Sequence, residues 1–429
     1  MEKKIYDAYL KILEAELVKS LGCTEPAAVA FTAAKATTLL GKMPESMEVN
    51  SSGNIIKNVK GVIVPNSGGL RGIAPAAILG MLVNKPEMEL AILDGATPED
   101  TAKAKELLEQ DFCKSTLEEG EGNLFVDVTV RAGDESARAV IRKSHTNIEL
   151  LEKNGEILQQ GKAEEEGADI SEMKKLLNVA DIVEFAKEVD VEEVKPIIGP
   201  AIECNMAIGE EGLKGGYGAE VGKTLIETYG DEDVLVRLKA KAAAGSDARM
   251  AGSVLPVVIN SGSGNQGITI TCGVKEFANG IGASEEEAFR ALTIANLISV
   301  HIKRHIGPLS AFCGAVSAGA GVSAGITYLQ GGTTEQIGMA ITNVLCDLGG
   351  AVCDGAKASC AAKIASSLDA AVMGSKMALA GRVYQPDEGL VLDNIDETIK
   401  SVGYVGRVGM KETDIEILHV MLGDRDLSI

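Results

Sequence analysis

The sequence predicts an α+β fold, with a mainly helical Gly/Ala-rich domain and an inserted smaller α+β domain. Three observations predict it. First, 45% of the 429 residues are hydrophobic but only 3% are aromatic, and there are 49 glycines, a composition suited to helices packed closely through small side chains. Second, apolar residues recur at helical spacing near the N-terminus and beyond residue 170. Third, the segment between them shows the alternation of β-strands.

The first segment, residues 2–20, has its apolar side chains at the spacing of an amphipathic helix. After a break, Thr24 can cap a second helix that runs to Leu40. Cys23 then lies at a helix N-terminus, where the helix dipole favours a thiolate. We expect residues 1–45 to form N-terminal helices that pack on the C-terminal helical domain.

Residues 46–165 have the sequence pattern of a small α+β domain. Between Phe125 and Val130, valines occupy every second position, which is the pattern of a half-buried strand. A polar run at 159–167 predicts a linker. The expected elements are strands at 54–64, 124–131 and 137–143, and helices at 72–83 and 98–110.

Residues 166–429 are expected to form the large helical domain, with helices at 171–188, 191–211 and 284–304. The last of these opens with a capping box of Ser284 and Glu287 and is apolar over most of its circumference, which indicates a central helix. The uncharged run 306–334 is long enough to span a membrane, but its many Gly, Ala and Ser residues are only weakly apolar. We expect a buried helix there.

The charge of the chain restricts its partners. Asp and Glu total 62 against 41 for Lys and Arg, and the net charge of -21 repels nucleic acid and anionic membranes. A small-molecule substrate is therefore expected. The N-terminal residues carry charges at once and include no apolar signal segment, so we expect a cytoplasmic protein whose eight cysteines stay reduced or bind metal.

Three cysteines have settings that suit an inorganic cofactor. Cys313 and Cys353 lie among Gly and Ala residues, and Cys23 follows a glycine far upstream. Small neighbours let a bulky group approach the backbone, and thiolates are the ligands of iron–sulfur clusters. The alternative is that these cysteines are small buried hydrophobes. Cys360 would stand about 10.5 Å from Cys353 along a continuous helix, which makes it a doubtful ligand of the same cluster.

Four motifs, in order along nearly the whole chain, are shared with a known family. They are Gly22–Pro26, Ser261–Gly267, His305–Gly314 and Cys353–Cys360. With them the chain resembles the L-cysteine desulfidase family, which is related to the α-chain of iron–sulfur L-serine dehydratases.

The resemblance implies an enzyme with a [4Fe-4S] cluster that converts L-cysteine to pyruvate, ammonia and hydrogen sulfide. The family's three cluster ligands match Cys23, Cys313 and Cys353. The pattern of the related serine dehydratases would instead map onto Cys313, Cys353 and Cys360.

Candidates for the base that removes the substrate's α-proton are His305, Lys357 and Asp354, which lie beside the cysteine motifs. The other interpretation of His305 is a helix-end residue that satisfies backbone carbonyls. Glycine-rich loops can point backbone N–H groups at a carboxylate, although a plain turn is their commoner meaning. The substrate-binding candidates are Ser261, Gly262 and Asn265 in one such loop, Ser67 and Gly68 in another, and Thr24 and Glu25 beside Cys23.

Three alternatives stay open. An iron–sulfur L-serine dehydratase would run the same elimination with a hydroxyl leaving group. A pyridoxal-phosphate lyase would need a lysine in a strand–helix setting, and the sequence has no convincing motif of that kind. A non-enzymatic amino-acid-binding protein would bind a ligand without sulfide release. The sequence is compatible with a homo-oligomer and does not fix the oligomeric state.

Overall fold

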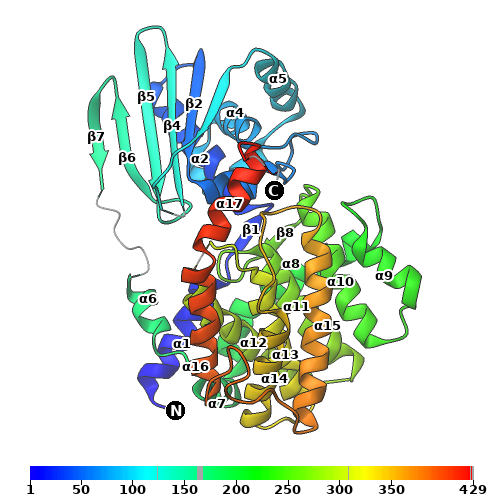
Figure 1. The fold of residues 1–429 in the computed structure, drawn as a ribbon. Coiled ribbons are helices and arrows are strands. Elements are labelled where there is room, and N and C mark those ends of the chain that lie inside the picture. The colour runs from blue at the N-terminus through cyan, green and yellow to red at the C-terminus, as the bar shows by residue number, and fades with distance from the viewer. Residues whose placement is uncertain (123, 162–167, 308, 426, 428–429) are drawn as a thin grey trace.

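The computed structural model describes residues 1–122, 124–161, 168–307, 309–425 and 427. Figure 1 shows a sheet with flanking helices at the top and a larger helical region beneath it. Each region has its own hydrophobic core. This is the mainly helical α+β fold that the sequence predicted.

The two N-terminal helices belong to different cores. Helix α1 (Lys3–Glu16) packs in the helical region, where the ring of Tyr9 lies edge-on against Phe185 with centroids 5.4 Å apart. Helix α2 (Thr24–Leu40) instead packs against the sheet and α4 (Ile73–Val83). Alanine is the commonest of its buried residues, and the backbone of α4 approaches so closely that a Cβ on Gly80 would lie 2.1 Å from the carbonyl oxygen of Ala30. The division of the chain at residue 45 stays a prediction.

The sheet has the strand order β3-β2-β4-β5-β6-β7. β2 pairs with β3 in parallel, and the other neighbouring strands pair antiparallel. The strands are β2 (Ser46–Ser51), β3 (Cys113–Leu117), β4 (Phe125–Ala132), β5 (Glu135–Arg142), β6 (Ile148–Lys153) and β7 (Glu156–Gln160). The other helices of this region are α3 (Gly53–Lys60), a 3₁₀ segment (Pro86–Gly95) and α5 (Pro98–Glu109).

The strands expected at 124–131 and 137–143 and the helices expected at 72–83 and 98–110 are present. The strand expected at 54–64 is wrong, because residues Gly53–Lys60 form helix α3. Its β-branched residues Ile55, Ile56 and Val59 are buried at helical spacing, so tertiary packing overrides their strand preference. Much of the expected linker 159–167, including the proposed boundary after residue 165, lies outside the described residues.

Helix α12 (Glu285–Ile306) lies at the centre of the helical region, and most of its residues are buried. Its predicted capping box of Ser284 and Glu287 is confirmed. The surrounding helices are α6 (Ala168–Lys174), α7 (Val179–Glu188), α8 (Val191–Leu213), α9 (Val221–Tyr229), α10 (Val234–Met250), α11 (Gly264–Gly280), α13 (Gly314–Leu329), α14 (Thr334–Leu348), α15 (Cys360–Leu379) and α16 (Ile395–Tyr404). A short π-helical turn (Val405–Gly409) leads from α16 to α17 (Lys411–Leu422).

Two segments of the helical region, 171–188 and 306–334, can be compared with the helices expected there. The single helix expected at 171–188 is two helices, because Asn178 caps the N-terminus of α7 with its side chain. The uncharged run 306–334 contains the expected buried Gly/Ala helix, α13. Among the described residues, no helix has the length and apolarity needed to cross a membrane.

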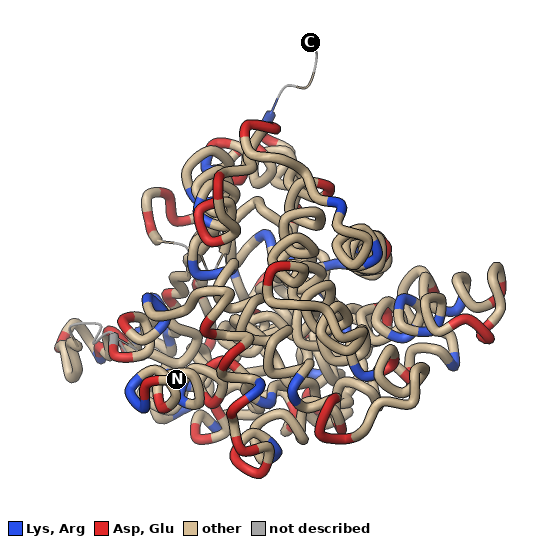
Figure 2. The backbone as a smooth tube through the Cα atoms, turned by 90° about the horizontal axis from the view of Figure 1, so that it is seen from below, with Lys and Arg blue, Asp and Glu red and all other residues tan. Residues whose placement is uncertain are grey.

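Helix α17 returns to the sheet region, as the red helix in Figure 1 shows. Its Asp414 forms an ion pair with Lys57 of α3, whose side chain is only 2% exposed. The amide of Asn54 donates to the same carboxylate at 3.0 Å. The last helix therefore fixes α3. Acidic and basic residues lie interspersed along the outer helices and loops (Figure 2), so the net negative charge is not gathered on one face in that view.

The contact between α12 and α13 depends on small residues and can be tested by adding one methyl group. A Cβ on Gly321 would lie 2.4 Å from the carbonyl oxygen of Ala295, whereas a Cβ on Gly338 of α14 would meet its nearest atom at 3.5 Å. We expect Gly321→Ala to lower the free energy of unfolding by about 1–3 kcal/mol, the cost of overpacking. Gly338→Ala should leave it unchanged or raise it by up to about 1 kcal/mol.

Denaturant unfolding followed by circular dichroism measures both variants. Equal stabilities for the two would show that α13 can move away from α12 without cost.

Candidate functional site

A cavity of about 1030 Å³ lies where the sheet region and the helical region meet. It is lined by residues from α2, α3, the β5–β6 turn, α10 to α13 and the segment that leads into α15. Of the residues singled out in the sequence, the cavity is lined by Cys23, Thr24, Glu25, Ser261, Gly262, Asn265, Cys313 and Cys353. Those that do not line it are Ser67, Gly68, His305, Asp354 and Lys357.

A short antiparallel bridge between Phe312 and Val352 holds two of the cysteines together. The N–H of Cys313 donates to the carbonyl of Ala351 at 3.0 Å, and the N–H of Cys353 donates to the carbonyl of Ala311 at 2.6 Å. Two segments that are far apart in the sequence are therefore fixed side by side by their backbones. Cys313 is the N-cap residue of α13, so its side chain sits at the positive end of that helix.

A second two-stranded pairing fixes Cys23. Strand β1 (Lys19–Leu21) pairs antiparallel with β8 (Pro256–Val258), and Cys23 follows β1 as the N-cap residue of α2. The turn between them needs glycine, because Gly22 has a φ of 61° and a Cβ there would lie 2.3 Å from Pro65. The N-terminal segment is thus tied to the helical region just before it enters the sheet region.

Arg249 joins this turn to the glycine-rich loop. Its Nε donates to the carbonyl of Gly22 at 3.1 Å, and its Nη1 donates to Oδ1 of Asn265 at 3.3 Å. Gly264 makes room for the guanidinium, since a Cβ there would lie 2.4 Å from Nε. The glycine at this position therefore serves close packing against an arginine.

Glu25 gathers hydrogen bonds beside Cys23. Its carboxylate accepts from the Cys23 thiol, the Thr24 hydroxyl and the Asn58 amide, each at 3.0 Å. Burial raises the pKa of Cys23, and the Glu25 carboxylate raises it further, so the expected thiolate at this helix N-terminus is not favoured by the chain alone. Burial also acts to raise the pKa of Glu25, but His145 and the thiol of Cys23 outweigh it, and the net pKa is lowered.

Cys360 also lines the cavity. It is the first residue of α15, and Cys353 precedes that helix, so the axial spacing of a continuous helix does not separate the two. Cys360 packs against the small buried cluster that contains Cys23 and Met250. Burial raises the pKa of Cys313 to about 11, and the neighbouring Cys353 and Cys360 contribute to that increase. Cys353 and Cys360 are therefore close enough to affect the ionisation of Cys313.

Among the described residues, no three His, Cys, Asp or Glu side chains close around a single metal ion. The cysteines are gathered around one cavity without converging on one point.

Four helices begin at the cavity. Residues at the N-termini of α2, α11, α13 and α15 line it, and the dipoles of these helices make it favourable for anions. The turn before α11 is formed by Ser261 and Gly262, with φ values of 51° and 78°, and Ser263 caps the helix. The cavity also has more cations than acids: the basic lining residues are Lys57, Arg142, Lys143, Lys174, Arg249, Lys303, Arg304, Lys363 and Arg407, and the acidic ones are Glu16 and Glu25.

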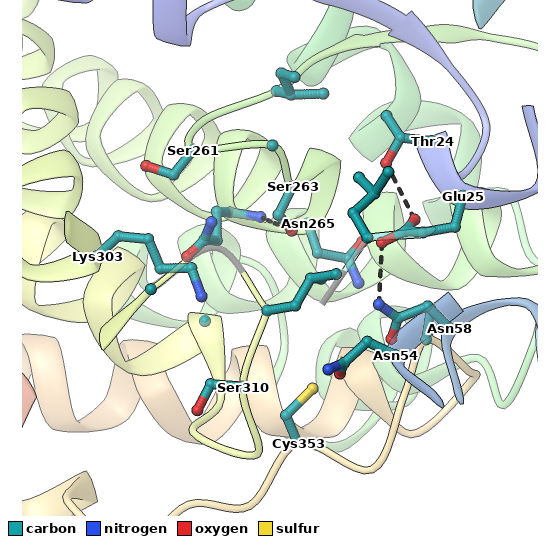
Figure 3. A pocket seen from close by; sticks show the side chains of 18 of the residues that line it. Thr24, Glu25, Asn54, Asn58, Ser261, Ser263, Asn265, Lys303, Ser310 and Cys353 are labelled. Carbon is teal, nitrogen blue, oxygen red and sulfur yellow. Dashed lines mark hydrogen bonds between the residues drawn. The ribbon is translucent and has the colours of Figure 1, made fainter. Parts of the chain in front are cut away.

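Lys303 is a buried cation without a partner. It lies on α12 and is 8% exposed, and its ammonium makes no hydrogen bond or ion pair within the described residues. Burial lowers its pKa to about 8, while nearby Cys353 and Cys313 act in the opposite direction. Figure 3 shows its side chain entering the pocket on the side opposite Glu25. A buried, unpaired cation destabilises a fold, which points to a functional reason for keeping it.

The base candidates from the sequence lie outside this lining. His305 accepts a hydrogen bond from Nε of Arg304 at 3.0 Å, and burial together with that guanidinium lowers its pKa to about 3. Asp354 forms ion pairs with Lys357 at 2.5 Å and Lys363 at 2.6 Å. Burial acts to raise the pKa of Asp354, but the two lysines outweigh it and bring the value to about 2. The Asp354 carboxylate is therefore engaged in these two ion pairs.

The second glycine-rich loop has a structural explanation. The hydroxyl of Ser67 accepts the N–H of Leu70 at 2.9 Å, and Gly68 packs against Thr101 of α5. Within the described residues, neither Ser67 nor Gly68 lines the cavity. Their placement favours the plain-turn interpretation.

Several lining residues were not identified from the sequence, chiefly Arg249, Lys303, Asn58 and His145. Lys303 had a signal in the sequence, since it directly follows the stretch 291–302, which contains no Asp, Glu, Lys or Arg. Asn58 was hidden by the wrong strand assignment of α3. Nothing near His145 in the sequence indicates that its turn meets the cysteine segments.

Comparison with known proteins assigns the family. The model of the serine dehydratase alpha chain matches residues 87–419. The UPF0597 protein of Lachnoclostridium phytofermentans is 46% identical over 97% of this chain and all of that protein, and the one of Desulfitobacterium hafniense is 44% identical over 98% of each. The UPF0597 protein of Treponema denticola is 42% identical over 99% of this chain and all of its own length.

The fold and the site thus define a protein with a cysteine-lined, anion-favouring cavity between two regions. The chain belongs to the serine dehydratase alpha chain family. The name of that family denotes a lyase reaction, which gives the coarse functional class.

The effect of the buried Lys303 ammonium on the free energy of unfolding can be measured. Because the pKa of Lys303 is about 8 in the fold and near 10.5 when exposed, the unfolded chain binds more protons between these values, and stability rises with pH there. We expect Lys303→Met to raise the free energy of unfolding at pH 7 by up to about 3 kcal/mol, since each tenfold change in proton affinity corresponds to about 1.4 kcal/mol. The gain should shrink as the pH rises from 8 to 10.

Lys363→Met is the matched control. This lysine also lines the cavity, but the ion pair with Asp354 outweighs its burial and raises its pKa, so its contribution to stability is present below about pH 10.5. Its loss should lower stability at pH 7. Urea unfolding across this pH range measures both. A Lys303→Met variant less stable than wild type at pH 7 would contradict the assignment of an uncompensated buried charge.

Proposed function

We propose that this protein is an L-cysteine desulfidase, which uses a [4Fe-4S] cluster to eliminate sulfide from L-cysteine and yields pyruvate, ammonia and hydrogen sulfide. The observation that carries the proposal is that Cys23, Cys313 and Cys353, from three distant segments, line one cavity. Membership of the serine dehydratase alpha chain family supports the lyase class, and the resemblance of the four motifs supports the choice of substrate.

The residues present fit such a cluster. A single ion draws its ligands to within about 2.3 Å of one point, but a cluster distributes its thiolates over separate corners, so cysteines arranged around a cavity suit it better. Thiolates and cluster sulfides carry negative charge, and the four helix N-termini and the ammonium of Lys303 would stabilise it.

When bound by three cysteines, a cluster supplies one iron that lacks a protein ligand and acts as a Lewis acid toward the substrate's thiol. The chain's own residues bind and orient the amino acid. Its carboxylate would be held at the N-terminus of α11, where Ser261, Gly262 and Asn265 line the cavity and Arg249 adds positive charge. Thr24 lies on the Glu25 side of the pocket in Figure 3 and would face the substrate from there.

L-serine is the second candidate substrate, and the name of the matching family favours it. Hydroxyl and thiol leaving groups need the same placement of carboxylate, amine and α-proton. The softer thiol suits an iron site with sulfur ligands. If Cys360 replaced Cys23 as the third ligand, the site would follow the serine dehydratase pattern instead.

The cluster ligands can be identified by anaerobic reconstitution followed by iron and acid-labile sulfide analysis. We expect Cys23→Ala, Cys313→Ala and Cys353→Ala each to lower bound iron by more than about tenfold, since even residues that only support metal ligands contribute that much to affinity. Turnover of L-cysteine should disappear with the iron.

Cys360→Ala and Cys346→Ala are the matched controls, the first inside the cavity lining and the second outside it, and both should keep the cluster. Loss of iron in Cys360→Ala with retention in Cys23→Ala would replace the proposed ligand set by the serine dehydratase pattern. Wild-type protein that binds no iron but shows a reducible imine would reject the cluster in favour of pyridoxal phosphate.

Substrate preference is measured by kcat/KM for L-cysteine and L-serine under anaerobic conditions, with pyruvate as the common product. We expect the value for L-cysteine to exceed that for L-serine by at least about tenfold, the scale on which small differences in a pocket discriminate substrates. The reverse order would make the protein a serine dehydratase. Binding of L-cysteine without pyruvate or sulfide would leave the amino-acid-binding protein as the correct alternative.

A further inference from the structure

The proposed elimination needs a group that takes the α-proton, and the described cavity lining restricts the choice. Most of its charged side chains already have partners: Lys57 pairs with Asp414, Lys174 with Glu16, and Lys363 with Asp354. Arginines stay protonated. The titratable groups that remain near the cysteine segments are the buried Glu25 and Lys303 and the half-buried His145.

His145 reaches the cavity on the turn that connects β5 to β6 in the sheet region. Arg142, the last residue of β5, forms ion pairs with Glu121 and Glu149. The same guanidinium stacks over the ring of Phe125 at 4.7 Å. This residue anchors the turn at the rim of the cavity.

Backbone hydrogen bonds complete the turn. The carbonyl of Arg142 accepts from the N–H of Ser144 at 2.9 Å and from the side-chain amide of Asn147 at 3.0 Å. The N–H of Lys143 donates to the carbonyl of Leu124 at 3.1 Å. The conformation around His145 is therefore fixed by residues on both sides of it, as a reacting group requires.

The imidazole of His145 has a free nitrogen at the cavity. Its Nε2 is buried and has no hydrogen-bond partner among the described residues. Burial lowers the pKa of His145, which keeps the ring neutral at neutral pH, and the nearby Glu25 carboxylate acts in the opposite direction. A buried polar atom without a partner is costly, and a substrate can supply what the protein does not.

Glu25 is well placed to support a proton on His145. Its carboxylate accepts from the Thr24 hydroxyl and the Asn58 amide, and these two donors hold it in place when Cys23 binds the cluster as a thiolate. Glu25 and His145 line the same cavity, and the carboxylate acts to raise the pKa of the imidazole. A carboxylate that interacts with an imidazole stabilises the imidazolium after proton transfer.

We propose that His145, supplied by the sheet region, is the general base that removes the α-proton of the substrate. This inference rests on the proposed function. Nε2 takes the proton from Cα, the electron pair of that bond forms the Cα–Cβ double bond, and the Cβ–S bond breaks with its electron pair on sulfur. Sulfide leaves, and the resulting 2-aminoacrylate tautomerises and reacts with one water to give pyruvate and ammonia.

Lys303 has a different place in this arrangement. Cys353 and Cys313 act to raise its pKa, so Lys303 lies nearer to these two cysteines than to Cys23, which is bonded to Glu25. Figure 3 shows it on the side opposite Glu25. An ammonium at that position can offset the negative charge of the cysteine ligands and of the substrate carboxylate. The proton acceptor must then come from the side of the cavity that holds Glu25.

The test is His145→Gln in the anaerobically reconstituted protein. Loss of a general base lowers kcat by about 10²–10⁴-fold. Iron content should equal that of wild type, and calorimetry should give an affinity for L-alanine, which has the same carboxylate and amine but no leaving group, within about threefold of wild type. Imidazole added to the His145→Ala variant should raise its kcat at least about tenfold, because free imidazole can diffuse into the cavity and act as the base.

His419→Gln is the control, since this histidine lies on α17, bonded to Asp424, outside the cavity lining. It should keep wild-type kcat. A His145→Gln variant that retains more than about a third of wild-type kcat overturns the inference. So does one that loses iron or L-alanine binding together with activity, because the role would then be structural. Wild-type protein that releases no sulfide fails the proposed function itself, an outcome that the wild-type assay reports separately.

Discussion

The arrangement of the site depends on the backbone bridge between Phe312 and Val352. Two reciprocal N–H to carbonyl hydrogen bonds, at 3.0 and 2.6 Å, fix the segments before α13 and α15 against each other. Without this bridge, Cys313 and Cys353 would sit on independent loops. With it, they face a common cavity as α13 leaves in one direction and the segment toward α15 in another.

The other supports of the site follow the same principle. The β1–β8 pairing brings Cys23 to the helical region, Arg249 ties that turn to the glycine-rich loop, and Arg142 anchors the turn that holds His145. These supports are a short strand pairing, side-chain hydrogen bonds of Arg249 and ion pairs of Arg142. Because four helices begin at the cavity, its electrostatic character follows from backbone direction as much as from side chains, in a chain whose net charge is -21.

Local patterns in the sequence were sufficient for much of the fold. The capping box of Ser284 and Glu287 defined the central helix, and the alternating valines of β4 defined a strand, because both signals involve neighbours in the chain. They failed at α3, where burial of Ile55 and Ile56 overrides strand preference. Cys23, Cys313 and Cys353 were chosen for their small neighbours and a family resemblance, and the structure places all three at one cavity. His145 and Arg249 were missed, because their contribution depends on contacts across more than a hundred residues.

We propose that three cysteines of this cavity hold a cluster with one iron open to the substrate. The sharpest test is Mössbauer spectroscopy of protein reconstituted with ⁵⁷Fe, recorded before and after addition of L-cysteine. The signal of about a quarter of the iron should change when the substrate binds, because one of four irons lacks a protein ligand. A spectrum that stays unchanged while the same sample releases sulfide would rule out this binding mode.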